Sequence, residues 1–262
     1  MLKLTEIIRV DIAMYLRALK RAQVATMLLW KIPLVMFLLL FAFPFVANLM
    51  SNFGIVGGFV LGFVFAALIT LLLPCLEAGV RAEKTGLEII RRRFFFLFPA
   101  VLTVTFIFFI INELLNRALP VSAMNLRILL GAALTLLFNP VLESIYLATE
   151  DGINSLRHSL HFMRENWPEW LVPHLIIVAP LIWHDQLLFK VQFIQGNPIT
   201  YLEVLLLDYA YLGADLNLVL RLLYSVLLCF LFFGFLVFRG ALFKALDGST
   251  RRKRIFQDRM GN

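Results

Sequence analysis

The chain has 262 residues, of which 61% are hydrophobic and 16% are charged, and its mean hydropathy is +0.87. Soluble domains carry about 25% charged residues, so this composition excludes a chain that covers its surface with polar groups in water. The net charge of +7 lies mainly in segments that flank apolar runs, which favours anionic lipid over nucleic acid as its partner. The sequence therefore predicts an all-α polytopic membrane protein.

The first expected element is an amphipathic helix in residues 1–23. Its apolar side chains follow helical spacing, and they are Ile7, Ile8, Ile12, Tyr15 and Leu16. Such a helix lies on the cytoplasmic membrane surface with its basic face outward. The apolar run that follows exceeds the roughly 7–15 residues of a signal-peptide core, so we expect it to remain attached as the first span.

Six transmembrane helices are predicted within a domain at residues 24–238. The apolar runs approach the roughly 20 residues that cross about 30 Å of hydrocarbon. The spans are expected at residues 24–49, 53–76, 94–112, 128–148, 170–189 and 217–238. The fifth is the weakest, because its apolar run from Trp170 is interrupted by His184 and Asp185.

The distribution of lysine and arginine predicts the orientation. With the N-terminus inside, the flanks at residues 1–31, 77–93, 149–169 and 239–262 hold 20 of the 24 basic residues. This positive-inside bias predicts a bacterial-type inner membrane protein with both termini in the cytoplasm. It also supports six crossings, because five would place the basic tail at residues 239–262 outside. Anionic headgroups are the expected partners of these flanks.

Two further features concern the loops. Residues 199–212 follow a helix-start signal and precede Gly213, so we expect a helix lying on the outer interface. Short amphipathic segments precede spans one, three and five, which suggests three hairpin units. The alternative is that any basic interfacial helix produces the same pattern.

The segment that leads into span five carries a family resemblance. It contains a glycine, an Arg-x-Ser step and an Asn-Trp pair, at Gly152, Arg157, Ser159, Asn166 and Trp167. This pattern and the six-span layout resemble a loose group of bacterial integral membrane proteins. The group includes the membrane domain of glycerophosphodiester phosphodiesterases and several uncharacterised families. The resemblance implies a six-span architecture, and it carries no catalytic residue to this chain.

Span two contains a stripe of small residues. Gly54, Gly58, Gly62 and Ala66 recur at every fourth position, which allows a second helix to approach closely. The sequence favours packing within the chain, and a homodimer or another membrane protein is the alternative partner. We call this set the glycine stripe.

Span four contains a polar stripe where the other spans are apolar. Thr135, Asn139, Glu143 and Tyr146 fall on one helical face, and Pro140 should interrupt the helix. Three interpretations remain open for Glu143. It could pair with a basic residue such as Arg239, line a pathway for a solute, proton or lipid headgroup, or act as a catalytic acid or base.

The histidines and tryptophans near span five allow other interpretations. His158, His161 and Glu165 have the spacing of metal ligands on a helix, but the histidines are expected on its wet side. We therefore predict no metal site. Trp167 and Trp170 are expected to mark the cytoplasmic interface. His174 is expected to be hydrogen-bonded inside the bundle.

No catalytic motif was found, so the sequence predicts a non-enzymatic protein without a cofactor. A transport-like or transport-accessory function, with a polar pocket around span four, fits the polar stripe best. The alternative is a membrane scaffold or assembly factor that uses the glycine stripe. Cys75 and Cys229 lie within apolar runs and are expected to act as small hydrophobic residues.

Overall fold

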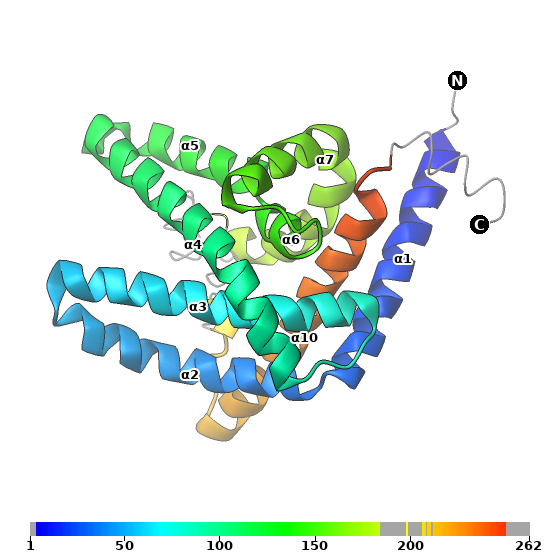
Figure 1. Ribbon diagram of the computed structural model, residues 1–262, viewed down its shortest axis with the longest axis horizontal. Coiled ribbons are helices and arrows are strands. Elements are labelled where there is room, and N and C mark those ends of the chain that lie inside the picture. The colour runs from blue at the N-terminus through cyan, green and yellow to red at the C-terminus, as the bar shows by residue number, and fades with distance from the viewer. Residues whose placement is uncertain (1–3, 184–197, 199–205, 208, 211, 250–262) are drawn as a thin grey trace.

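The computed structural model describes residues 4–183, 198, 206–207, 209–210 and 212–249 (Figure 1). Within these residues the fold is helical and contains no strand, which confirms the all-α prediction. The elements are α1 (Leu4–Leu28), α2 (Lys31–Ser51), α3 (Gly54–Arg81), α4 (Leu87–Ala118), the 3₁₀ turn η1 (Val121–Ala123), α5 (Met124–Leu137), α6 (Val141–Tyr146), α7 (Gly152–Trp183) and α10 (Leu218–Leu246).

Four segments of the described chain are long and apolar enough to cross a membrane. They are Val56–Arg81, Leu87–Ala118, Met124–Tyr146 and Leu218–Leu246. A fifth is added if the bent pair Ile8–Leu28 and Lys31–Leu39 counts as one span. The chain is thus compatible with an integral membrane protein, but the prediction of six crossings is not confirmed. The predicted fifth span falls in α7, whose polar first half and three prolines lower its hydropathy.

The first helix extends beyond the boundary predicted between the amphipathic helix and span one. The first helix does not end at residue 23 but continues to Leu28, and the chain then bends by 81°. The reason is tertiary packing, since Ala22 and Ala25 are buried in the core that α1 forms with α10. Hydropathy alone cannot locate this bend, because residues 24–28 are as suitable for a packed helix as for a span.

The break predicted at Pro140 is present. The helix stops at Leu137, turns through residues 138–140, and resumes as α6. The amide of Val141 donates to the carbonyl of Phe138 at 3.0 Å, in place of a bond one residue further back. Because proline has no N–H, the carbonyl of Leu136 loses its usual helical donor.

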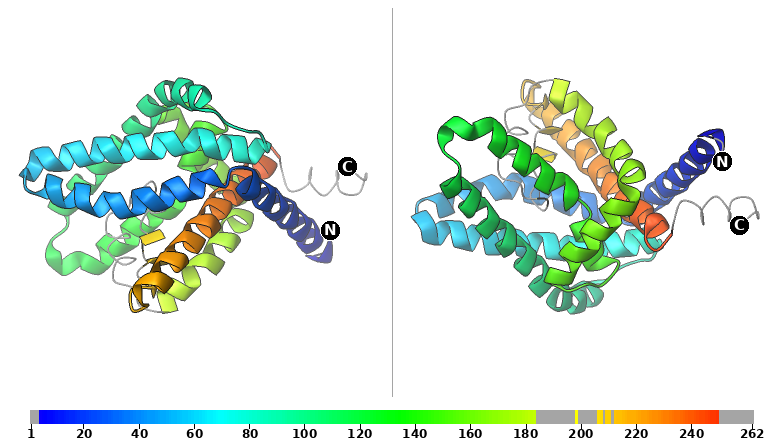
Figure 2. Two further views of the ribbon diagram at one scale, coloured as in Figure 1. Left: turned by 90° about the horizontal axis from the view of Figure 1, so that it is seen from below. Right: turned by 90° about the horizontal axis from the view of Figure 1, so that it is seen from above.

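The helices converge at one end of the molecule and separate toward the other (Figures 1 and 2). At the convergent end, α10 packs against α1, α2 and α3, while α6 lies against α7 and α4. Away from it, α2 with α3 and α4 with α5 point in different directions. The most extensive helix contacts are those of α1 with α10 and of α3 with α4, so the three predicted hairpin units are not confirmed.

Three predictions fall on other parts of the chain. The end of span five (residues 184–189), most of the outer helix at residues 199–212, and the basic tail beyond residue 249 lie outside the described residues.

Candidate functional site: a buried polar cluster around Arg239

Arg239 is the centre of the most polar part of the core. It lies in the last third of the mainly apolar helix α10, and its side chain is completely buried. Its Nε donates to Glu143 Oε1 at 2.8 Å and its Nη2 donates to Glu143 Oε2 at 2.9 Å. This two-point geometry is the strong form of an arginine–carboxylate pair, and it links α10 to α6.

Two further acceptors complete the environment of the guanidinium. Arg239 Nη2 also donates to the carbonyl of Asn139 at 2.9 Å, and Nη1 lies 2.7 Å from His174 Nε2. His174 Nδ1 lies 2.8 Å from the carbonyl of Trp170, which can only accept a proton. Nδ1 therefore carries the hydrogen, and Nε2 of a neutral imidazole accepts from Arg239.

Aromatic rings enclose this cluster. The indole of Trp170 lies 5.1 Å from the guanidinium carbon of Arg239, and the ring of Phe235 lies 5.9 Å from it. Both distances are within the range of cation–π attraction. Trp170 Nε1 also donates to Asn139 Oδ1 at 3.0 Å. The same indole therefore contacts both the guanidinium of Arg239 and the turn that separates α5 from α6.

All members of the polar stripe are buried, but they do not act alike. Asn139 and Glu143 contact Arg239, whereas Thr135 Oγ1 and Tyr146 Oη have no hydrogen-bond partner among the described residues. The pairing of Glu143 with Arg239 is the first of the three interpretations offered for Glu143. The guanidinium thus occupies the side of span four where the sequence suggested a pocket, and a pathway there stays a prediction.

The sequence located some of the cluster and misplaced one part of it. His174 is hydrogen-bonded within the bundle, as expected. Trp170 does not mark the interface, because it is completely buried, while Trp167 is 58% exposed. The aromatic-belt rule assigns tryptophans by their place near a span end, and it cannot separate a buried tryptophan from an exposed one three residues away on the same helix. The proximity of Trp170 to the buried His174 on the same helix face was the available signal.

A second ion cluster joins α3 to the beginning of α4, and the sequence analysis did not single it out. Glu77 is buried, and its carboxylate accepts hydrogen bonds from Arg93 Nη2 at 2.6 Å and from Arg93 Nε at 3.0 Å. Arg81 Nη2 lies 2.7 Å from the same carboxylate. The isolated acid near the end of an apolar run was the signal for this contact.

Ser144, His158 and Asp247 form a line that resembles the Ser–His–Asp arrangement of hydrolases. His158 Nδ1 lies 3.1 Å from Ser144 Oγ, and His158 Nε2 lies 3.2 Å from Asp247 Oδ1. However, the hydrogen bond to Asp247 raises the pKa of His158, which favours the charged ring that donates on both sides. Ser144 is buried and donates to the carbonyl of Pro140. The line therefore lacks an accessible nucleophile.

The spacing noted for metal ligands does not bring those residues together. His158 contacts Asp247, whereas His161 and Glu165 form an exposed pair at 3.5 Å. Among the described residues no group of three ligating side chains is assembled.

The glycine stripe divides into two parts. Ala66 is completely buried in the core. Gly58 is exposed, and no described atom lies within 4 Å of the position a Cβ would take at Gly58 or Gly62. Among the described residues, packing within the chain is therefore seen at Ala66 and not at Gly58 or Gly62.

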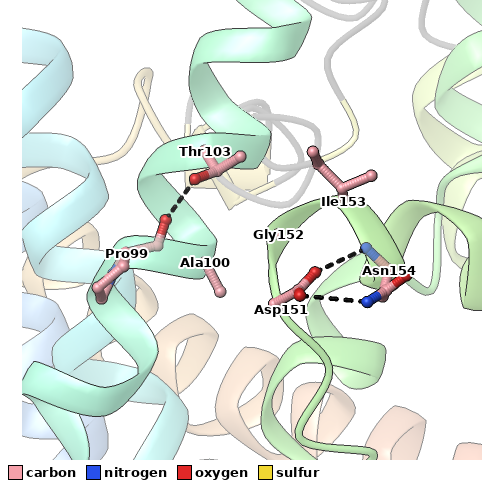
Figure 3. A pocket seen from close by; sticks show the side chains of 7 residues that line it. All are labelled: Pro99, Ala100, Thr103, Asp151, Gly152, Ile153 and Asn154. Atoms are coloured by element: carbon pink, nitrogen blue, oxygen red, sulfur yellow. Dashed lines mark hydrogen bonds between the residues drawn. The ribbon is translucent and has the colours of Figure 1, made fainter.

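A cavity of about 410 Å³ opens between α4 and the first turn of α7 (Figure 3). Its lining comes from Pro99, Ala100, Thr103, Asp151, Gly152, Ile153 and Asn154. Asp151 Oδ1 accepts the amide of Asn154 at 2.9 Å, so this carboxylate caps α7. The cavity is an open surface feature, separate from the Arg239 cluster.

Comparison with protein-family models, curated protein sequences and solved structures found no match to this chain. The kinship with the bacterial six-span group therefore stays a prediction.

Proposed function

We propose that this chain is a six-span inner-membrane protein with a transport-like or transport-accessory function. The observation that supports this proposal is the Arg239–Glu143–His174 cluster inside apolar helices. Ionisable groups within membrane helices are costly, on the order of 2.5–3.5 kcal/mol each at the centre, and they mark solute or proton pathways more often than chance.

The groups of this cluster could form one contact when His174 is neutral and break it when His174 is protonated. Its charged groups come from α6 and α10, and its neutral acceptor, His174, comes from α7. A proton on His174 Nε2 would remove the acceptor and place a positive charge against Arg239. Separation of α10 from α6 would then release Glu143 and Asn139 beside Thr135 and Tyr146. This polar face is the pathway that we propose.

Purified protein in liposomes tests the pathway. Proton uptake is followed with an entrapped pH-sensitive dye, and lipid movement is followed with a fluorescent phospholipid. We expect one of these fluxes above that of empty liposomes, and Glu143→Gln should change it when measured at a temperature at which this less stable variant is still folded. Glu113→Gln is the matched control, since Glu113 forms an exposed pair with Arg117. Fluxes equal to those of empty liposomes would mean that the Arg239 cluster only holds the helices together.

The orientation is tested with single cysteines in a background without Cys75 and Cys229. We propose that Ser122 and Asp215 lie outside, and that Lys84 and Ser249 lie in the cytoplasm. A membrane-impermeant maleimide should label the first two positions in intact cells and the last two only after permeabilisation. Labelling of Ser122 without Asp215 would mean that the predicted fifth span does not cross.

One observation favours a second candidate function, a scaffold for another membrane protein. Gly58 and Gly62 present open backbone on the first half of α3, which contains no charged residue. Glycines in such a position allow a foreign helix to approach closely. Photocrosslinking from a reactive group at position 58 in native membranes tests this candidate, because a membrane protein bound at the glycines would give a crosslinked product and an uncovered face would give none.

A further inference from the structure

Helix α1 presents three different faces along its length. The first is buried, and it consists of Val10, Met14, Ala18, Ala22 and Ala25. It packs along α10, and its alanines permit the close approach of the two helices. The hydroxyl of Tyr15 also donates to the carbonyl of Glu169 at 2.8 Å, which fixes α1 to α7. The rotation of α1 about its own axis is therefore determined by the protein.

The second face is apolar and has no covering element. Ile8, Ile12, Leu16 and Leu19 are between 48% and 60% exposed. At about 100° per residue these four side chains fall within about 80° of one another. A continuous exposed apolar strip of this kind marks an interaction surface.

The third face is basic and borders the second. It contains the exposed residues Arg9, Arg17, Lys20 and Arg21. On the helical wheel Arg9 and Lys20 lie beside Leu16, while Arg17 and Arg21 lie further round. The half-buried Asp11 lies on the other border of the apolar strip, next to the buried face. Among the described side chains of α1, the accessible charge beside the strip is therefore mainly positive.

The direction of α1 agrees with these faces. The bend of 81° sets α1 almost perpendicular to the first part of α2. If α2 enters the bilayer, α1 runs along its surface. Trp30 lies at the bend, is 50% exposed and has the ammonium of Lys31 5.8 Å from its ring. A tryptophan with an adjacent lysine is typical of the level of the headgroups.

We propose that α1 docks on anionic phospholipid, with the strip of Ile8, Ile12, Leu16 and Leu19 in the acyl boundary and the basic face against the phosphates. Because α1 is fixed to α10 and α7, this contact sets the height of the convergent end relative to the membrane. The surface is independent of the pathway proposed above. A protein groove is the less suitable occupant, since it would have to supply both an apolar floor and an anionic border that a lipid surface already combines.

The experiment uses the full chain in nanodiscs, with a polarity-sensitive fluorophore on Leu16→Cys in the background without Cys75 and Cys229. One nanodisc contains phosphatidylcholine, and the other contains equal parts of phosphatidylcholine and phosphatidylglycerol. We expect a blue shift, and quenching by spin-labelled acyl chains, that is stronger in the anionic nanodisc. The matched control is Arg17→Cys on the basic face of the same helix, which should report a more polar environment and weaker quenching by the acyl chains than the Leu16 probe does.

Charge removal tests the headgroup part of the proposal. Each of Arg9→Gln and Lys20→Gln should lower the ratio of docked to undocked helix by about fivefold in the anionic nanodisc, corresponding to about 1 kcal/mol per basic residue. Both positions are exposed, so an unchanged melting temperature verifies that each variant is folded. A Leu16 probe that stays in water in both nanodiscs would overturn the proposal. Energy transfer between labelled copies without quenching would also overturn it, in favour of a second chain on this face.

Discussion

The convergent end and the outer half of the α2–α3 pair have similar apolar residues but opposite packing. Around Arg239 the residues of four helices are buried, and Gly79, Gly152 and Gly240 each have a neighbouring helix where a Cβ would lie. Along the first half of α3, Phe53, Val56 and Phe59 are at least 50% exposed. Lipid is as apolar as these side chains, so the hydrophobic effect does not draw membrane helices together. Polar contacts and small residues determine which helices stay in contact.

The largest effect is expected for Glu143→Gln. The substitution keeps the shape but leaves the guanidinium of Arg239 buried with no negative partner, which should cost about 3–5 kcal/mol in the free energy of unfolding. The free energy of unfolding is measured by titrating the detergent-solubilised protein with a denaturing surfactant. The control Glu113→Gln should cost less than about 1 kcal/mol, because its pair with Arg117 is exposed.

A double substitution completes this test. Replacement of Glu143 and Arg239 together by methionine removes both charges and should recover most of the lost stability. If Glu143→Gln and its control proved equally stable, the ion pair would not be what holds the convergent end together.

The second effect compares glycines in the two regions. At Gly240 a methyl group would lie 2.6 Å from Val80 Cγ2 and would collide with the hydroxyl of Tyr146. Gly240→Ala should therefore destabilise the protein by about 1–3 kcal/mol through overpacking. Combination with Tyr146→Phe should restore part of this loss, since the hydroxyl is the nearest obstacle. Thermal unfolding of the two single variants and of their combination measures this recovery. If the effects of the two substitutions simply added, the packing of α10 against α6 at Gly240 would be loose.

The third effect is smaller and depends on pH. The pKa of His158 is raised in the folded protein by its contact with Asp247. The charged contact therefore stabilises the fold fully below the unfolded pKa of about 6.5, and this contribution is lost as the pH rises through the folded pKa. Both groups are partly exposed, so we expect less than about 1 kcal/mol.

Stability measured between acidic and mildly basic pH, in the parent and in Asp247→Asn, tests this contact. The parent should lose stability as the pH rises, and the variant should show a flatter profile. His158→Gln should give the same flat profile, because a single pair carries the effect. A slope that survives in both variants would assign the pH dependence to other groups.

The smallest effect on folding is expected at Gly58. No described atom lies near its Cβ position, so Gly58→Leu should leave the stability of the monomer within about 0.5 kcal/mol of the parent, as for other surface substitutions. Size-exclusion chromatography of the same samples then shows whether the substitution removes a dimer. A large loss of monomer stability would mean that the two regions are packed more alike than the structure indicates.

The sequence was sufficient to predict features that depend on a single segment of the chain. Apolar runs located the helices, and Pro140 located the break in span four. It was insufficient where distant segments meet. Arg239 is 96 residues from Glu143 and 65 residues from His174, so Arg239 could be named only as one of several partners for the acid. The end of α1 and the burial of Trp170 were missed for the same reason, since both depend on packing between distant helices.

The order of the chain places the two halves of this ion pair far apart in time. Synthesis proceeds from the N-terminus at about 5–20 residues per second, so the 96 residues between Glu143 and Arg239 require about 5–20 s. During that interval Glu143 and the free carbonyl of Asn139 are already made, but their guanidinium is not. The synthesis of α10 therefore completes the ion pair, and a chain interrupted before α10 would keep Glu143 without its arginine.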